Sequence, residues 1–233
     1  MRTTSRGTPL PHVRKATRDL HMSARKIIEC LVSDASPIRR RAFGAVVCPP
    51  LAIGAASSLV VMVMSIGLRP DLGDPDAISQ LAIGGGFGLG STLAGLAALL
   101  PSLRPDMDSA LPKRILTSVL VLLVAVATTQ VSTDRTNWSL VHFLTSSGCS
   151  PWMVAVLAIP PYLALAARLR SEAPTHLNVS GAALGLTSGG VGTFLHSFGC
   201  SEGSAALGLA SFSVGIGLAT LGGALMAPRL LRW

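Results

Sequence analysis

Six long apolar stretches, separated by short polar breaks, dominate the hydropathy pattern of this chain. None of them contains an internal Asp, Glu, Lys or Arg. A helix needs about 17–25 mostly apolar residues to cross a bilayer, so each stretch predicts a transmembrane helix. The pattern therefore predicts an all-α, polytopic membrane protein: a six-transmembrane-helix bundle over residues 42–233, preceded by a segment of residues 1–41. The spans are expected at about 42–68, 77–101, 115–132, 151–168, 178–197 and 204–227.

The composition favours a membrane protein over a soluble one. Hydrophobic residues make up 49% of the 233 residues, charged residues 13%, and the mean hydropathy is +0.56, whereas soluble domains carry about 25% charged residues. A net charge of +8 could point to nucleic acid, but aromatic residues make up only 4% and the apolar body carries no basic stripe. We expect the lipid bilayer as a partner and no direct contact with nucleic acid.

The basic residues near the span ends predict the orientation, because Lys and Arg are retained on the cytoplasmic side. With six spans, one face receives only Arg69 and Arg135. The other face receives seventeen of the nineteen Lys and Arg, namely the ten in residues 1–41 and Arg104, Lys113, Arg114, Arg168, Arg170, Arg229 and Arg232. This asymmetry predicts a multi-pass protein of a bacterial inner membrane with both termini in the cytoplasm.

Small residues four positions apart recur within the spans. Such spacing lets helix backbones approach closely in lipid, and we expect these residues to pack helices together. Pro49–Pro50 and Pro160–Pro161 lie inside spans and are expected to kink them, because proline lacks the backbone donor. The small pairs and triplets are Gly84/Gly88, Gly86/Gly90, Ser91/Gly95, Gly181/Gly185/Gly189, Ser213/Gly217 and Ala219/Gly223.

Two of the four cysteines fall at the outer edges of predicted spans. Cys149 precedes the fourth span and Cys200 the sixth, whereas Cys30 and Cys48 are expected to be reduced and inert. The outer pair could form a reversible disulfide, bind a soft metal together with His196 or His142, or remain two free thiols. The chain has no C-x-x-C, which argues against a disulfide-exchange enzyme. We expect no enzymatic activity, no cofactor and no dedicated metal site.

The N-terminal segment contains one amphipathic helix, expected over about residues 23–36. Ile27, Ile28, Leu31 and Val32 recur at helical spacing on an otherwise basic sequence, and Pro37 ends the helix. A helix this short gains its order by docking. It could lie on anionic lipid or in a groove of a soluble partner.

Five segments carry a resemblance to a known family. They are IIECLVSDASPIRR (27–40), GLRPDL (67–72), the run GCSPWM…GGVG (148–192), CSE (200–202) and the ending GGALMAPRLLRW (222–233). With these motifs, residues 23–233 resemble the NrsF-type anti-sigma factors, six-span proteins of the bacterial inner membrane. The family usually has His directly before the second cysteine and an aromatic pair early in the last span, where this chain has Gly199 and Ser211–Phe212. A basic extension precedes Met22, which is the expected start.

The resemblance implies that the N-terminal segment binds an extracytoplasmic-function (ECF) sigma factor. It implies that Cys149 and Cys200 match the family's cysteine pair, the thiols that sense oxidants or heavy metals. The residues implied to contact the sigma factor are Ile27, Ile28, Leu31, Val32, Asp34, Pro37 and Ile38.

Two other classes of function are compatible with parts of the pattern. A small six-span transporter would use the glycine-rich, proline-containing spans as a path, but ionisable residues at membrane depth are absent from the sequence of the spans. A membrane thiol-redox protein would use the two outer cysteines. The sequence leaves the oligomeric state and the identity of the inducer open.

Overall fold

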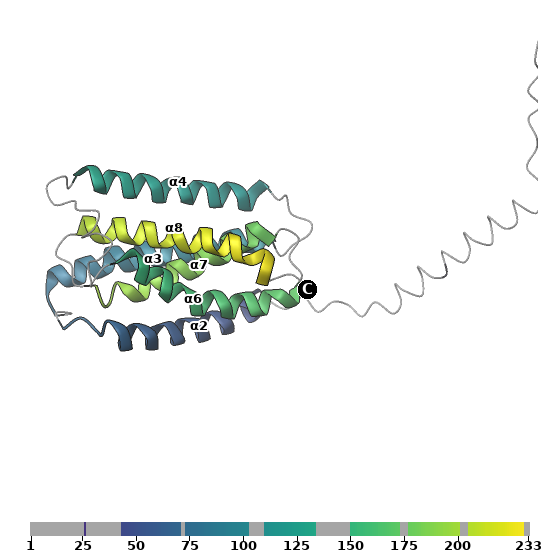
Figure 1. Ribbon diagram of the computed structural model, residues 1–233, viewed down its shortest axis with the longest axis horizontal. Helices are drawn as coiled ribbons and strands as arrows, with labels where there is room; N and C mark the ends of the chain where they lie inside the picture. The colour runs from purple at the N-terminus through teal and green to yellow at the C-terminus, as the bar shows by residue number, and fades with distance from the viewer. Residues whose placement is uncertain are drawn as a thin grey trace, which may run out of the picture. The chain divides into compact units, whose positions relative to one another are not determined.

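A computed structural model describes residue 26 and residues 43–70, 73–102, 110–133, 150–172, 177–200 and 205–230. The chain divides into two units at Arg41, and the second, residues 42–233, holds the long helices. They lie side by side in a bundle (Figure 1), and the described residues contain no strand, so the all-α prediction is confirmed. The helices are α2 (Phe43–Ser65), α3 (Pro75–Ser102), α4 (Ala110–Thr133), α6 (Pro151–Leu169), the short 3-10 helix η1 (Arg170–Glu172), α7 (Leu177–His196) and α8 (Ala205–Leu230).

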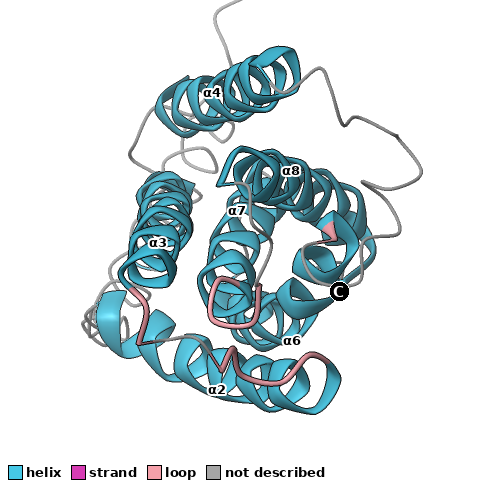
Figure 2. Cartoon of the chain, turned by 90° about the vertical axis from the view of Figure 1, so that its left-hand side faces the viewer, coloured by secondary structure: helices cyan, strands magenta, loops and turns pink. Residues whose placement is uncertain are grey.

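The six long helices coincide with the six apolar stretches, and five of them are long and apolar enough to cross a membrane. The exception is α7, which contains five glycines and four Ser or Thr residues. Its place in the bundle explains this composition. Figure 2 shows α7 in the middle, with α3, α6 and α8 around it and α4 at the periphery, and nearly every α7 residue from Ser180 to His196 is buried. A helix that faces protein on all sides does not need the lipid-compatible side chains that α4 exposes, such as Val121 and Leu122.

Glycines of α7 bring its backbone against two neighbouring helices. A methyl group on Gly190 would lie 2.5 Å from the amide nitrogen of Thr92 in α3, and one on Gly181 would lie 2.5 Å from the carbonyl oxygen of Gly223 in α8. Cβ atoms do not approach other atoms so closely, so glycine is required at these contacts. The predicted packing role is confirmed for Gly181, and Gly190, which is not among the predicted packing residues, makes an equally close contact.

For Gly86, Gly90 and Gly217 the packing prediction is wrong, because a methyl group on any of them would meet no atom within 4 Å. Gly86 and Gly90 are exposed on α3. They lie on the opposite side of α3 from Gly84, Gly88 and Gly95, which contact neighbouring side chains or backbone. A helix has one face toward its neighbours, so the four-residue spacing alone could not say which set of glycines faces them.

The prolines lie within α2 and α6, as predicted. Pro161 removes the backbone donor that would serve the carbonyl of Leu157 four residues earlier. The Ser58 hydroxyl of α2 donates to that oxygen at 2.7 Å. The backbone of Pro161 also sits directly against Gly54 of α2. The proline pair thus makes one close, hydrogen-bonded crossing between α2 and α6.

Candidate signal-sensing site at the Cys200 end of the bundle

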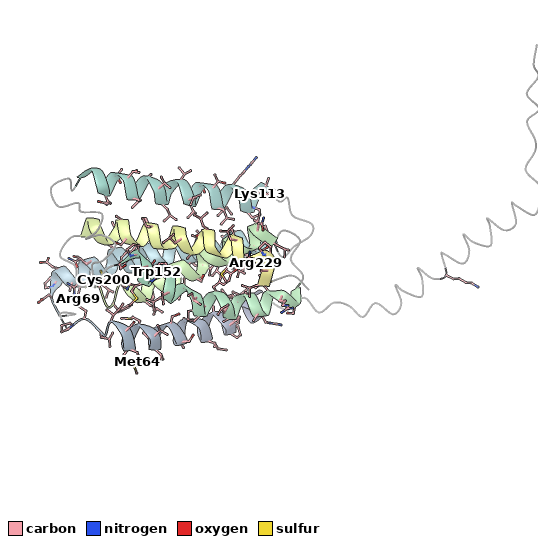
Figure 3. The ribbon with its side chains drawn as sticks, viewed as in Figure 1. Met64, Arg69, Lys113, Trp152, Cys200 and Arg229 are labelled. Atoms are coloured by element: carbon pink, nitrogen blue, oxygen red, sulfur yellow. The ribbon has the colours of Figure 1, made fainter. Side chains whose placement is uncertain are left out.

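The described basic residues separate the two ends of the bundle. Figure 3 shows Lys113 and Arg229 at one end, and Arg69 and Cys200 at the other. Three further arginines lie at the same end of the bundle as Lys113 and Arg229. Arg114 follows Lys113 in α4, Arg168 lies at the end of α6, and Arg170 begins η1. This distribution agrees with the positive-inside orientation, in which the Cys200 end faces away from the cytoplasm.

Cys200 lies directly after α7, on a tight turn. The amide nitrogens of Gly199 and Cys200 both donate to the carbonyl of His196, at 3.0 Å each. Cys200 is half-buried and disulfide-bonded, whereas Cys48 in α2 is a free, exposed cysteine. Cys149, the other predicted sensing thiol, lies outside the described residues, as does Cys30. The turn therefore holds one of the two predicted sensing cysteines at a defined place on the bundle.

Aromatic rings hold the end of α7 in place. Phe194 and Phe198 pack edge to face with centroids 5.3 Å apart. The His196 ring meets the ring of Phe212 from α8 in the same way, at 5.9 Å. Phe212 is thus half of the aromatic pair expected in the last span, and it supports the residue at which the Cys200 turn begins.

His196 is fully buried, and neither ring nitrogen has a hydrogen-bond partner among the described residues. The part of the chain that the structure describes contains no group of three or more His, Cys, Asp or Glu residues able to hold a metal ion. His142, the other histidine considered as a ligand, lies outside that part. The described contacts of His196 are thus a ring contact with Phe212 and backbone bonds to the Cys200 turn.

The loop after α2 is the second component of the site, and its arginine is not among the site residues predicted from the sequence. Gly67 has φ +82°, a conformation that favours glycine, and it turns the chain back toward α7. Arg69 then donates from its backbone nitrogen to the carbonyl of Phe198 at 3.2 Å. Its Nη1 donates to Oε1 of Gln80 at 3.1 Å and to the carbonyl oxygen of Cys200 at 3.2 Å.

Two sequence signals could have pointed to Arg69. It is one of only two basic residues assigned to the outer face, and it lies within the motif GLRPDL. Neither signal shows what it contacts, because Cys200 is 131 residues away in the chain.

Gly199 fits tightly against the same loop. A methyl group there would lie 3.1 Å from Cε of Met62 and 3.2 Å from the carbonyl oxygen of Gly67. A side chain at position 199 would require Met62, Ile66 or the Gly67 carbonyl to shift by a few tenths of an ångström. Gly199, which stands where the family usually has His, therefore fits the narrow space beside Met62 and Gly67.

The predicted sigma-binding residues lie outside the described part of the chain. They are Ile27, Ile28, Leu31, Val32, Asp34, Pro37 and Ile38.

A family model described as the negative regulator of sigma F, NrsF, matches residues 31–233. The chain belongs to this family. One relative of the NrsF-family protein, the probable anti-sigma-F factor NrsF of Azospira oryzae, is 25% identical over 182 residues, covering 77% of this chain and 85% of the relative. No solved structure matches the chain.

The family match covers the whole helical bundle of this NrsF-family protein, including the loop with Arg69 and the turn with Cys200. The match begins inside the N-terminal segment, at Leu31, so it includes the predicted sigma-binding residues from Leu31 to Ile38. The family is one of negative regulators, which places the chain among regulatory proteins.

Proposed function

We propose that this NrsF-family protein is a membrane anti-sigma factor that sequesters an ECF sigma factor in the cytoplasm and releases it on an external chemical signal. The family match over residues 31–233 carries the proposal. The protein would lie in a bacterial inner membrane with both termini in the cytoplasm, an orientation supported by the basic residues gathered at one end of the bundle.

The N-terminal segment is the part that binds the sigma factor in this proposal. Ile27, Ile28, Leu31 and Val32 form the apolar stripe that would enter a groove of the sigma factor. Asp34, Pro37 and Ile38 follow as further contacts. The segment precedes α2 in the chain.

Cys149 and Cys200 are the signal-sensing thiols in this proposal. Cys200 is disulfide-bonded and Cys48 is free, which leaves Cys30 and Cys149 as candidates for its partner. The positive-inside count assigns Cys30 to the opposite side of the membrane, which favours Cys149. When this disulfide forms, the two thiols lose two protons and two electrons to an oxidant; a soft metal instead displaces the two protons.

The buried interior of the bundle favours a regulator over an ion-coupled transporter. Among the described residues, the buried side chains with polar groups are those of Ser, Thr, His196 and Tyr162, whose hydroxyl donates to the carbonyl oxygen of Gly223 at 3.0 Å. Several Ser and Thr hydroxyls bond to carbonyls of their own helix, as Thr187 does to Ala183 at 2.8 Å. Ion-coupled transport needs ionisable groups at membrane depth. Among the described residues, the buried ionisable groups are Tyr162 in α6 and His196 at the end of α7, and no Asp, Glu, Lys or Arg side chain is buried.

The test uses the full-length protein and transcription from a promoter that depends on the cognate sigma factor. Ile28→Asp/Leu31→Asp introduces two charges into the apolar stripe, so we expect constitutive transcription and loss of the sigma factor from affinity-purified protein. Ser33→Asp/Ser36→Asp adds the same charge away from the stripe and should retain repression. Equal sigma retention in both double variants would contradict the proposed binding segment.

The sensing half is tested in the same cells. Cys149→Ala/Cys200→Ala should abolish induction by diamide, which accepts two electrons and two protons from a thiol pair, and by cadmium. Cys48→Ala is the matched control and should be induced normally. Undiminished induction of the double variant would show that other groups sense the signal.

A further inference from the structure

We propose that Arg69 couples the state of Cys200 to helix α2, and through α2 to the segment that binds the sigma factor. This inference rests on the proposed function and deepens it, since it names the residue through which a chemical event at the thiol reaches the rest of the protein. Arg69 is a positioning residue here: it acts on the Cys200 turn and carries out no chemistry of its own.

The guanidinium of Arg69 joins three elements. One nitrogen, Nη1, donates both to the side chain of Gln80 in α3 and to the main-chain oxygen of Cys200 after α7, and Arg69 itself belongs to the loop that follows α2. The backbone of Arg69 adds the bond to Phe198. A change in the bonding of the Cys200 sulfur alters the backbone of the same residue, and the carbonyl held by Arg69 is part of that backbone.

The link continues into α2 over a short distance. The amide nitrogens of Ile66 and Gly67 donate to the carbonyl of Met62, at 2.9 and 3.3 Å, so the loop is a direct extension of the helix end. The side chain of Met62 is fully buried and lies against Gly199. The Cys200 turn thus holds the end of α2 by a polar contact through Arg69 and by an apolar contact through Met62.

The burial of Arg69 indicates a specific role. Its side chain is only partly exposed, and its Nε is buried without a hydrogen-bond partner among the described residues. The described residues give it no carboxylate partner either; both acceptors of Nη1 are neutral oxygens. An arginine held at the edge of an apolar bundle in this way is costly to keep, and loop closure alone does not need a charge.

A contact between two sites couples them only if its removal leaves the first site responding to the signal while the second site no longer responds. The experiment therefore replaces Arg69 by Gln in the full-length protein and measures two quantities in the same cells. The first is the ratio of sigma-dependent transcription with and without diamide. The second is the modification of the thiols themselves, followed by the gel shift that a polyethylene-glycol maleimide produces.

We expect the thiols of the Arg69→Gln protein to be oxidised by diamide as in the unchanged protein, while the transcription ratio falls to one. A ratio of one at either a low or a high transcription level means that the sigma-binding segment no longer follows the thiols. Arg170→Gln, which removes an exposed arginine at the opposite end of the bundle, should keep the full ratio. A full ratio for Arg69→Gln at normal membrane abundance would overturn the proposal.

Two further arms keep the result decisive. If Arg69→Gln does not accumulate in the membrane, Gln80→Leu is used instead, because it removes one of the two acceptors of the Arg69 side chain and should lower the transcription ratio. Ser79→Ala, at the exposed neighbouring position, is its control. An unchanged ratio for Gln80→Leu would then overturn the coupling role. The unchanged protein and Cys149→Ala/Cys200→Ala test the proposed function separately. If the unchanged protein responds through its cysteines and Arg69→Gln responds equally well, only the coupling role fails. If the double cysteine variant still responds, the proposed sensing role of Cys149 and Cys200 fails.

Discussion

At the scale of single residues, the α2–α6 crossing shows how a defect in one helix is corrected by another. Pro161 leaves the Leu157 carbonyl without its helical donor, and in a bilayer no water replaces that donor. Ser58 supplies it from α2. The hydroxyl is fully buried, so its bond to Leu157 is protected from competition. This pair ties the helix that follows the N-terminal segment to the interior of the bundle.

Ser58→Ala should therefore destabilise the protein, by about 1–2 kcal/mol in the free energy of unfolding, because the Leu157 carbonyl is left unpaired in an apolar setting. Unfolding of the purified protein by titration with sodium dodecyl sulfate measures this. Ser57→Ala is the control: the Ser57 hydroxyl bonds to carbonyls of its own helix, Ile53 and Gly54, so its loss should cost much less. Equal losses for the two variants would mean that the interhelical bond contributes nothing.

At the scale of the helix, α7 is built to be surrounded. In lipid, helices associate by close packing rather than by the hydrophobic effect, and small residues permit the closest approach. Gly185 lies against the backbone of Ala219 and Thr220 in α8, and Gly192 lies against the backbone of α6. The hydroxyls of Thr187 and Ser188 bond back to their own helix. A modest hydropathy is thus the consequence of an interior position.

Gly185→Val should lower the free energy of unfolding by about 1–3 kcal/mol, the usual range for overpacking a tight contact, because the added side chain meets α8 backbone. Gly86→Val adds the same atoms to the exposed face of α3, where nothing lies within 4 Å. That variant should unfold at nearly the same detergent concentration as the unchanged protein. If Gly86→Val is the more damaging of the two, the exposed face of α3 is a packing surface after all.

At the scale of the whole molecule, the charges define an axis. The basic residues of the bundle gather at the ends of α4, α6 and α8, and the Cys200 turn lies at the opposite end (Figure 3). The helices between them expose mainly apolar side chains. A signal received at the Cys200 end must therefore be carried along the helices to reach the basic end, and α2 is the helix connected in the chain to the N-terminal segment.

This axis predicts how the protein is accessible from the two sides of the membrane. In a chain whose four native cysteines are replaced by alanine, Asp74→Cys should react with a membrane-impermeant maleimide in spheroplasts, because Asp74 is exposed at the Cys200 end. Arg170→Cys, exposed at the basic end, should react only after the membrane is opened. The reverse pattern of labelling would invert the proposed topology and place the thiol site in the cytoplasm.

The fold class, the number of long helices and their approximate ends follow from the local sequence. The reason is that a bilayer imposes a length and an apolar composition on each span, and these are properties of local sequence. The sequence also places Cys200 in the polar break between the fifth and sixth spans, since polar and charged residues collect in these breaks.

The packing of the helices in three dimensions is needed to say which helix is central, which glycines pack and what surrounds Cys200. Gly86 and Gly88 have similar local sequence, yet only Gly88 faces α7, because the facing side depends on the neighbours of a helix. Arg69 and Cys200 belong to segments far apart in the chain and meet only when α2, α3 and α7 come together at one end of the bundle. Side-chain contacts between distant segments follow from the packing of helices, and the hydropathy pattern along the chain does not predict which helices pack together.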